Sequence, residues 1–167
     1  ISKKKTLGQA ADCIKASRQL KKNDILTIGA CDNAMNYNKK SLKSKINNSE
    51  LVVWTFKDKK IISKNANMYG YVKTDQNDNI VKVSCKKKIS KFPWKDHTII
   101  GAFSFKRAEI FIKYTKKLLA SNLRINNEYY MDSVADICVK SGIKAKVNLV
   151  NKYYGWGTPL DIKNYLK

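Results

Sequence analysis

The sequence predicts an α/β fold, with a mixed, mostly parallel sheet flanked by helices. The first observation behind this prediction is the order of elements, because apolar strand-like runs alternate with amphipathic segments. The second is size, because 167 residues, of which 43% are hydrophobic, suffice for one sizeable core. Neither an internal repeat nor a long linker divides the chain. We therefore expect a single domain over residues 1–167.

The expected strands are short apolar runs bounded by turn residues. Two of them, "YGYVKT" and "IVKVSC", are separated by "QNDN" and predict a hairpin. The largely apolar run "LVVWTF" predicts a further strand. Strands are expected over residues 25–30, 51–56, 69–74, 80–85, 98–105 and 144–150.

The expected helices carry apolar residues at helical spacing. Gly142 is placed to end one of them, and Thr158 with Pro159 is placed to begin the last. Segment 57–67, by contrast, is polar and is expected to be an exposed excursion. Helices are expected over residues 8–20, 38–50, 106–120, 127–142 and 158–167.

The charge of the chain is strongly positive, with 34 basic and 13 acidic residues and a formal net charge of +21. The basic residues are almost all Lys, scattered from end to end beside abundant Asn and Ile, with no Arg cluster. This pattern favours compositional bias over nucleic-acid binding. A module that binds nucleic acid through Lys and aromatic side chains stays open as an alternative, and a basic surface also suits phosphorylated substrates.

Several classes of protein are not expected. The chain has no run of about 18 apolar residues that would predict a membrane span, and "ISKKKT" lacks the apolar region of a signal peptide. The four cysteines form no Cys-x-x-Cys pair and His97 is the only histidine, so a zinc site is not predicted and reduced thiols fit a cytoplasmic protein. The chain does not begin with Met, which suggests a fragment of a longer protein.

The segment "ILTIGACDN", residues 25–33, places the carboxylate of Asp32 just after an expected strand. In open α/β sheets ligands bind beyond the carboxyl ends of strands, and Asp oxygens suit Mg²⁺. An Asx turn at Asp32 or Asn33 is the alternative. Two later segments carry related signals: "NEYYMDS" holds Glu128 and Asp132 at a helix start, and "YYGWGTPLD" sets glycines beside a helix N-terminus.

Six segments, in this order, are similar to those of one enzyme family. They are "TLGQAA", "ILTIGACDN", "YGYVKTDQNDNIVKVSCKK", "IIGAFSFKRAEIF", "NNEYYMDSVADICVKSG" and "YYGWGTPLDIKNYL". Together they make the chain resemble the later two-thirds of the sugar-1-phosphate nucleotidyltransferases, which have a GT-A-like α/β fold. The resemblance implies transfer of a nucleoside monophosphate from a nucleoside triphosphate to a sugar 1-phosphate, with release of pyrophosphate.

The resemblance also implies roles for single residues. Two are implied to be catalytic, with Asp32 binding Mg²⁺ and Lys86 facing the sugar phosphate. The remaining implied contacts are to the nucleobase by Gly8 and Gln9, to the sugar by the backbone of Gly70, and to the sugar hydroxyls by Glu128. For Lys86 the alternative is a solvated run with Lys87 and Lys88. We interpret Cys31 and Cys85 as structural and His97 as a loop residue.

The chain departs from the family pattern in four ways. The Gly-x-Gly-x-Arg segment that cradles the triphosphate is not in this sequence, which implies an N-terminally truncated domain and leaves the activity of the chain alone open. Cys85 stands where the family has a sugar-binding Glu, and Ile99 where it often has Asn. Gly155 stands at the second metal-binding position, for which Asp161 is the nearest carboxylate.

The partners expected from the resemblance are a nucleoside triphosphate, a sugar 1-phosphate and Mg²⁺, in the synthesis of surface-polysaccharide precursors. No membrane partner is expected, and a homo-oligomer is left open, as are the base and the sugar. A non-catalytic nucleotidyltransferase-like domain that binds a nucleotide sugar or a partner is the second alternative.

Overall fold

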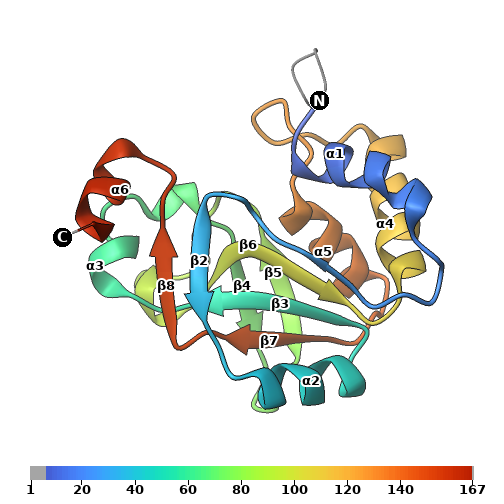
Figure 1. Cartoon of the computed structure of the whole chain (residues 1–167), viewed down its shortest axis with the longest axis horizontal. Helices are drawn as coiled ribbons and strands as arrows, with labels where there is room; N and C mark the ends of the chain where they lie inside the picture. Colours follow the sequence, from blue (N-terminus) through green and yellow to red (C-terminus); the bar gives the residue numbers. More distant parts are fainter. Residues whose placement is uncertain (1–6, 167) are drawn as a thin grey trace.

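The computed structural model describes residues 7–166 (Figure 1). The strands are β1 (Leu26–Ile28), β2 (Asn33–Asn36), β3 (Leu51–Phe56), β4 (Tyr71–Thr74), β5 (Ile80–Ser84), β6 (His97–Phe105), β7 (Ala145–Leu149) and β8 (Lys152–Gly155). The helices are α1 (Gln9–Ala16), α2 (Lys39–Asn48), α3 (Lys59–Ile62), α4 (Ala108–Ser121), α5 (Met131–Lys140) and α6 (Pro159–Tyr165). Short 3-10 turns cover 17–19, 66–68 and 93–95.

The main sheet is built around β6. Its strand order is β5-β4-β6-β3-β7, with β1 paired to β6 beside this path. Only β3 and β7 pair in parallel; the pairs of β6 with β1, β3 and β4, and of β4 with β5, are antiparallel. The mixed α/β class is thus confirmed. The share of parallel pairs is smaller than the sequence predicted, because a strand of opposite direction lies at the centre.

Two strands, β1 and β4, pair with opposite ends of the same edge of β6. We call this arrangement the fork, and it positions the site. β4 pairs with the start of β6 at His97 and Thr98, whereas β1 pairs with its end from Phe103 to Phe105. The last residue of β1 and the first of β4 therefore approach the same short stretch of β6 from opposite directions. Gly101 in that stretch has φ +78°, and its carbonyl accepts a hydrogen bond from the Ala30 amide at 3.1 Å.

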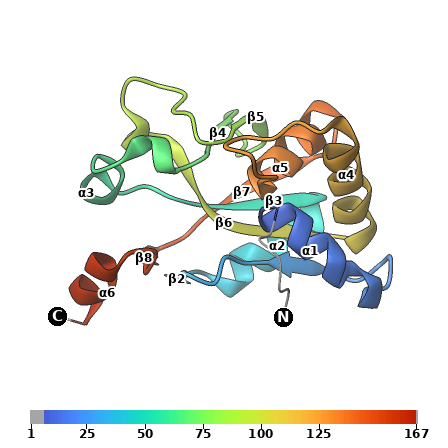
Figure 2. The same ribbon diagram turned by 90° about the horizontal axis from the view of Figure 1, so that it is seen from above.

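Helices cover both faces of the sheet (Figures 1 and 2). Strand β3 is buried at all six positions, and its side chains alternate between two cores. Leu51 and Val53 face α1, α4 and α5, while Val52, Trp54 and Phe56 face α2, α3 and the pair β2–β8. This explains why the run "LVVWTF" carries no polar alternation.

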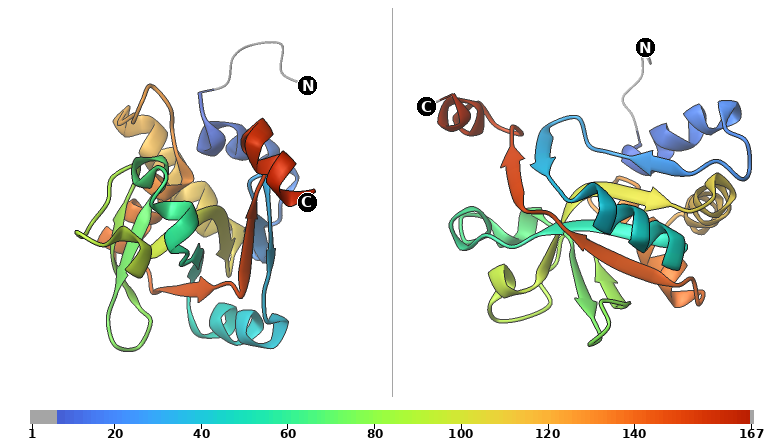
Figure 3. Two further views of the ribbon diagram at one scale, coloured as in Figure 1. Left: turned by 90° about the vertical axis from the view of Figure 1, so that its left-hand side faces the viewer. Right: turned by 60° about the horizontal axis from the view of Figure 1, so that its bottom comes forward.

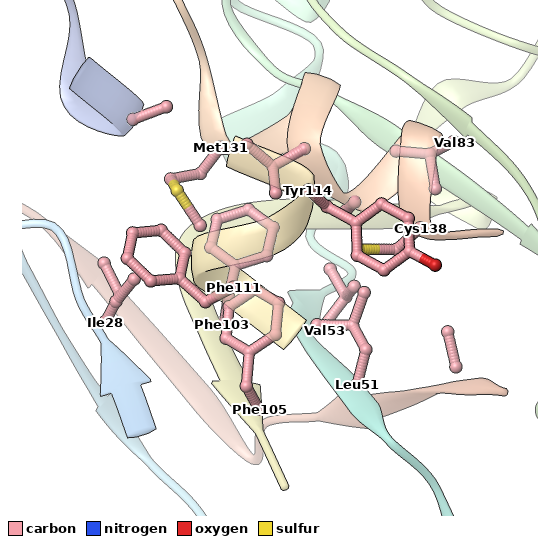
Figure 4. Close-up of a cluster of buried hydrophobic side chains, with 14 of the residues drawn as sticks. Ile28, Leu51, Val53, Val83, Phe103, Phe105, Phe111, Tyr114, Met131 and Cys138 are labelled. Atoms are coloured by element: carbon pink, nitrogen blue, oxygen red, sulfur yellow. The ribbon is translucent and has the colours of Figure 1, made fainter. Parts of the chain in front are cut away.

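The larger core lies between the sheet and α4 and α5 (Figure 4). Phe103 and Phe105 of β6 pack there beside Phe111, and the rings of Phe105 and Phe111 lie 5.6 Å apart. Met131 begins α5 in full burial. This core fixes the start of α5, which borders the cleft described below.

A second, two-stranded sheet lies apart from the first (Figure 3). β2 and β8 pair antiparallel from Asn33 opposite Gly155 to Asn36 opposite Lys152. The sequence analysis did not predict this pair. It brings the "CDN" and "GWG" segments together, although more than 120 residues separate them along the chain.

Three other expected segments differ from the structure, two in their bounds and one in its secondary structure. The expected strand 25–30 shortens to β1, in which only Ile28 is buried, and Ile25 is 64% exposed. The expected helix 127–142 begins only at Met131, because Asn126 and Asn127 adopt positive φ. The excursion 57–67 contains α3, whose Ile62 is fully buried. Among the helices of residues 7–166, none combines the length and the hydropathy of a membrane span.

Candidate active site

A cleft of about 630 Å³ lies over the fork in the main sheet. Its floor is formed by Ile99, Ile100 and Gly101 of β6, and its walls come from the segments after β1, before β4, after β5, before α5 and around α6. Five of the six residues with implied roles line it: Gln9, Asp32, Gly70, Lys86 and Glu128.

Asp32 lies at one side of the cleft, four residues beyond the end of β1. Its backbone carbonyl accepts a hydrogen bond of 2.7 Å from the Trp156 amide, and the neighbouring Asn33 side chain donates to the Ile100 carbonyl at 2.9 Å. A Cβ on Gly157 would lie 3.3 Å from Asp32 Oδ2. The pairing of β2 with β8 therefore fixes the backbone of Asp32. Gly157 leaves the space beside its exposed carboxylate open to the cleft.

The second carboxylate on this side is Asp161, in the first turn of α6. Its Oδ2 accepts hydrogen bonds from Thr158 N at 3.1 Å and Thr158 Oγ1 at 2.7 Å, forming a capping box. Its other oxygen makes none of these bonds. Tyr153 lines the same cleft, and burial, Tyr69, Asp32 and Asp161 all raise the pKa of its phenol, which stays neutral.

These residues fit a magnesium ion of the kind that takes one or two carboxylates and completes its shell with substrate phosphates. Asp32 supplies hard oxygen ligands, and Gly155 and Gly157 leave the space beside it without side chains. Within residues 7–166 no group of three His, Cys, Asp or Glu residues is arranged to hold a metal ion. Asp32 is thus a candidate ligand for magnesium, and Asp161 lines the same cleft.

Gln9 begins α1 and lines the cleft, whereas Gly8, the residue before the helix, does not. A Cβ on Gly8 would lie 2.8 Å from both the backbone nitrogen and oxygen of Tyr129, and Gly8 has φ +106°. Gly8 therefore packs behind the cleft, against the segment that leads into α5. The Gln9 side chain lines the cleft and donates a hydrogen bond to the Gly101 carbonyl at 3.3 Å.

Lys86 follows β5 and projects into the cleft. It has φ +53°, an unusual backbone conformation for a residue with a side chain. Its ammonium group donates a hydrogen bond to the Met68 carbonyl and lies 5.2 Å from the centre of the Tyr130 ring. Lys86 is therefore held by specific contacts, unlike the exposed Lys87 and Lys88 beside it.

Gly70 precedes β4 and is buried against α5. A Cβ at this position would lie 2.1 Å from Asp132 Oδ2 and 2.8 Å from the Ser84 carbonyl oxygen. Asp132 is only 9% exposed yet also lines the cleft. Burial raises its pKa to about 6, while Lys86 and a hydrogen bond from the Cys85 thiol act in the opposite direction.

Glu128 lines the cleft on the segment that precedes α5. Its backbone exchanges two hydrogen bonds with Ile125, of 3.0 and 2.9 Å, which form a tight turn. Its carboxylate accepts a hydrogen bond from Tyr130, and burial together with this bond raises the pKa of the Tyr130 phenol to about 12. Glu128 and Tyr130 thus act together at the cleft wall.

Among the lining residues that had no role assigned from the sequence are Tyr130, Asp132 and Tyr153. Tyr153 stacks on Phe56 at 4.2 Å, a contact that depends on β8 crossing the end of β3. The doublets "YY" and the acidic residue within "NEYYMDS" can be read in the sequence, but only the structure shows that these residues line one cavity. The remaining tyrosines of the lining are Tyr69, Tyr154 and Tyr165.

His97 and the cysteines lie outside the cleft lining. His97 is the first residue of β6 rather than a loop residue, and its Nδ1 hydrogen-bonds Thr55 Oγ1 at 2.9 Å. Burial is the main cause that lowers its pKa to about 4. Cys31 and Cys85 are free thiols, and burial raises the pKa of Cys85 to about 12, so it is not an activated nucleophile.

No protein-family model and no curated protein matches the sequence. Solved structures do match the fold. A nucleoside-diphosphate-sugar pyrophosphorylase from Vibrio cholerae superposes with a TM-score of 0.73 at 13% identity, covering 98% of this chain and 66% of that one. An inositol-1-phosphate CTP transferase from T. maritima gives 0.69 at 16% identity, with coverages of 96% and 60%.

A third structure, HddC from Yersinia pseudotuberculosis complexed with GMP-PN, gives a TM-score of 0.62 at 13% identity, covering 98% of this chain and 63% of that one. The chain thus spans a little under two-thirds of the length of each of these structures. Almost all of it takes part in the match. The protein therefore has the fold found in these nucleotidyltransferases.

Proposed function

We propose that the protein is a sugar-phosphate nucleotidyltransferase, which transfers a nucleoside monophosphate from a nucleoside triphosphate to a sugar 1-phosphate and releases pyrophosphate. The observation that carries the proposal is the convergence of Gln9, Asp32, Gly70, Lys86 and Glu128 on one cleft. The fold shared with nucleotidyltransferases supports it. We further propose that the reaction takes place in the cytoplasm and supplies surface-polysaccharide synthesis.

The protein's part in this reaction is positioning and charge compensation. The end of the cleft at Gln9 would receive the nucleobase, and the end at Gly70 and Glu128 would receive the sugar. Lys86 would hold the attacking phosphate, whose oxygen forms a bond to the α-phosphorus as the bond to pyrophosphate breaks. Asp32, with Asp161 lining the same cleft, would hold Mg²⁺, which supplies charge neutralisation at the triphosphate.

The first prediction concerns Asp32→Asn in the full-length protein. Removing the main negative ligand should lower the rate of pyrophosphate release by at least about 100-fold, as expected when a principal electrostatic element is lost. The assay would offer each nucleoside triphosphate with a panel of sugar 1-phosphates and Mg²⁺. It would also identify the base and the sugar.

Asp12→Asn is the matched control, because Asp12 lies on α1 outside the cleft lining and pairs with Lys15 at 3.0 Å. This variant should release pyrophosphate at the wild-type rate. A near-normal rate in Asp32→Asn would reject the role of Asp32. Wild-type protein that releases no pyrophosphate with any pair of substrates would reject the activity itself.

A further inference from the structure

The buried carboxylate of Asp132, in the cleft that Lys86 also lines, is the least expected feature of the site. Asp132 lies in the first turn of α5, where the helix dipole favours a negative charge. That position alone does not require burial, yet Asp132 is 91% buried and still borders the cavity. Among the ion pairs of the described residues, none includes Asp132. A buried carboxylate without such a pair is costly to the fold.

The chain makes room for this carboxylate. Asp132 Oδ2 occupies the place where a side chain on Gly70 would begin, so only glycine fits at position 70 beside this carboxylate. The positive charge of Lys86 acts on Asp132, and the Cys85 thiol donates a hydrogen bond to it. Both residues come from the segment directly after β5.

Lys86 is constrained on the other side by its own contacts. Its left-handed backbone directs the side chain toward the Met68 carbonyl and the Tyr130 ring. In the protein without substrate the ammonium group of Lys86 thus already contacts the Met68 carbonyl and the Tyr130 ring, and it experiences the negative charge of Asp132. An incoming anion must draw it away from this arrangement.

We propose that Asp132 is a positioning residue for Lys86. Its buried carboxylate, which lies against Gly70 in the cleft that Lys86 also lines, attracts the ammonium group and competes with the phosphate of the acceptor for it. This inference rests on the proposed function. Two consequences follow. Loss of the carboxylate should strengthen anion binding at Lys86, because a repelling charge is removed, and should slow transfer, because the ammonium group is less well oriented.

The pH dependence of anion binding at Lys86 gives a second, independent test of the proposed role of Asp132. Asp132 loses its negative charge as the pH falls through about 6, the pKa set mainly by its burial. Cys85, which hydrogen-bonds Asp132, and Tyr130, whose ring lies against Lys86, have pKa values near 12 and keep their protons throughout. Glu128 is the other acid on this wall and calls for its own variant, Glu128→Gln.

The test uses inorganic sulfate as the probe, because sulfate keeps both charges where a phosphate monoester titrates. Its affinity is followed by NMR through the backbone amides of Gly70 and Lys86 in the wild-type protein, without nucleotide. Sulfate affinity should rise as the pH falls from about 8 to about 5. In Asp132→Asn it should be about 3- to 10-fold tighter at pH 7 and independent of pH.

Asp136→Asn is the matched control on the same helix, since Asp136 pairs with Lys140 at 2.6 Å and does not line the cleft. It should keep the wild-type pH profile, and Lys86→Met should abolish binding. A pH dependence that persists in Asp132→Asn, or one that disappears in Glu128→Gln instead, would overturn the inference. So would equal sulfate binding by wild type and Lys86→Met.

Turnover separates the inference from the function on which it rests. If pyrophosphate is released, Asp132→Asn should lower kcat about 10-fold without raising KM for the acceptor, whereas a purely structural residue would impair both. If sulfate binding behaves as expected but no pyrophosphate is released, the inference stands and the proposed reaction fails. If turnover occurs and Asp132→Asn leaves kcat and the pH profile unchanged, the inference fails alone.

Discussion

At the scale of single residues, the cleft depends on glycines that make space for acids. Gly70 accommodates the carboxylate of Asp132, and Gly157 lies beside that of Asp32. The sequence assigned Gly70 to sugar binding through a family resemblance. The structure adds a packing reason that no single sequence could provide, because Asp132 lies more than 60 residues further along the chain.

Gly70→Ala should destabilise the protein, because the new Cβ would lie 2.1 Å from Asp132 Oδ2 and 2.8 Å from a backbone oxygen. We expect a loss of about 1–3 kcal/mol in the free energy of unfolding, the usual cost of overpacking. Urea denaturation measures this loss. In Gly29→Ala, where no atom lies within 4 Å of the added Cβ, stability should stay close to wild type; an equal loss in both variants would contradict the packing argument.

At the scale of elements, α6 shows what local sequence can predict. Thr158 was expected to cap this helix and Pro159 to occupy its first position, and both are confirmed. The reason is that capping depends on residues within one turn of each other. The capping box adds Asp161, and the helix places Leu160 and Tyr165 on the cleft wall.

Thr158→Ala should loosen α6 without unfolding the rest of the chain. Removing an N-cap costs about 0.5–2 kcal/mol, and the helix packs mainly beside β8 at the edge of the molecule. Hydrogen exchange should accelerate at the amides of α6, and Trp156 fluorescence should change because its ring lies 5.2 Å from that of Tyr165. Thr158→Ser, which keeps the hydroxyl, should exchange like wild type; exchange that speeds up equally in both variants, or in neither, would contradict the capping role.

The pair β2–β8 is an element that local sequence does not predict. Its strands "NAMN" and "KYYG" show no period-two alternation of apolar and polar residues, and neither is fully buried. Each becomes a strand because the other lies beside it, across the end of the main sheet. Asp32 and Asn33 gain their positions at the cleft from this pairing.

At the scale of the whole molecule, stability should depend on pH through two groups of opposite sign, the half-buried His97 and the buried Asp132. The pKa of His97 is lowered to about 4 in the fold, so its stabilising contribution is present above about pH 6.5 and is lost as the pH falls to about 4. The pKa of Asp132 is raised to about 6, so its contribution is present below about pH 3.8 and is lost as the pH rises through about 6.

His97→Gln should therefore weaken the loss of stability on acidification from pH 6.5 to pH 4. The amide can still hydrogen-bond Thr55 but takes up no proton in this range. Thermal unfolding at several pH values measures the slope. Asp132→Asn should have the opposite effect, with its largest gain over wild type above pH 6. If stability changes with pH in both variants as it does in the wild type, these two groups do not govern the pH dependence of stability.

The sequence by itself determined the class of fold and most element positions, because periodicity, capping and turn chemistry act over a few neighbouring positions. The candidate residues came from its resemblance to an enzyme family, and their roles stay predictions. Only the tertiary structure decided the central antiparallel β6, the pairing of β2 with β8 and the burial of Asp132 against Gly70. These features depend on contacts between segments far apart in the chain. The position of Lys86 at the cleft follows from such contacts, not from the lysine run in which it stands.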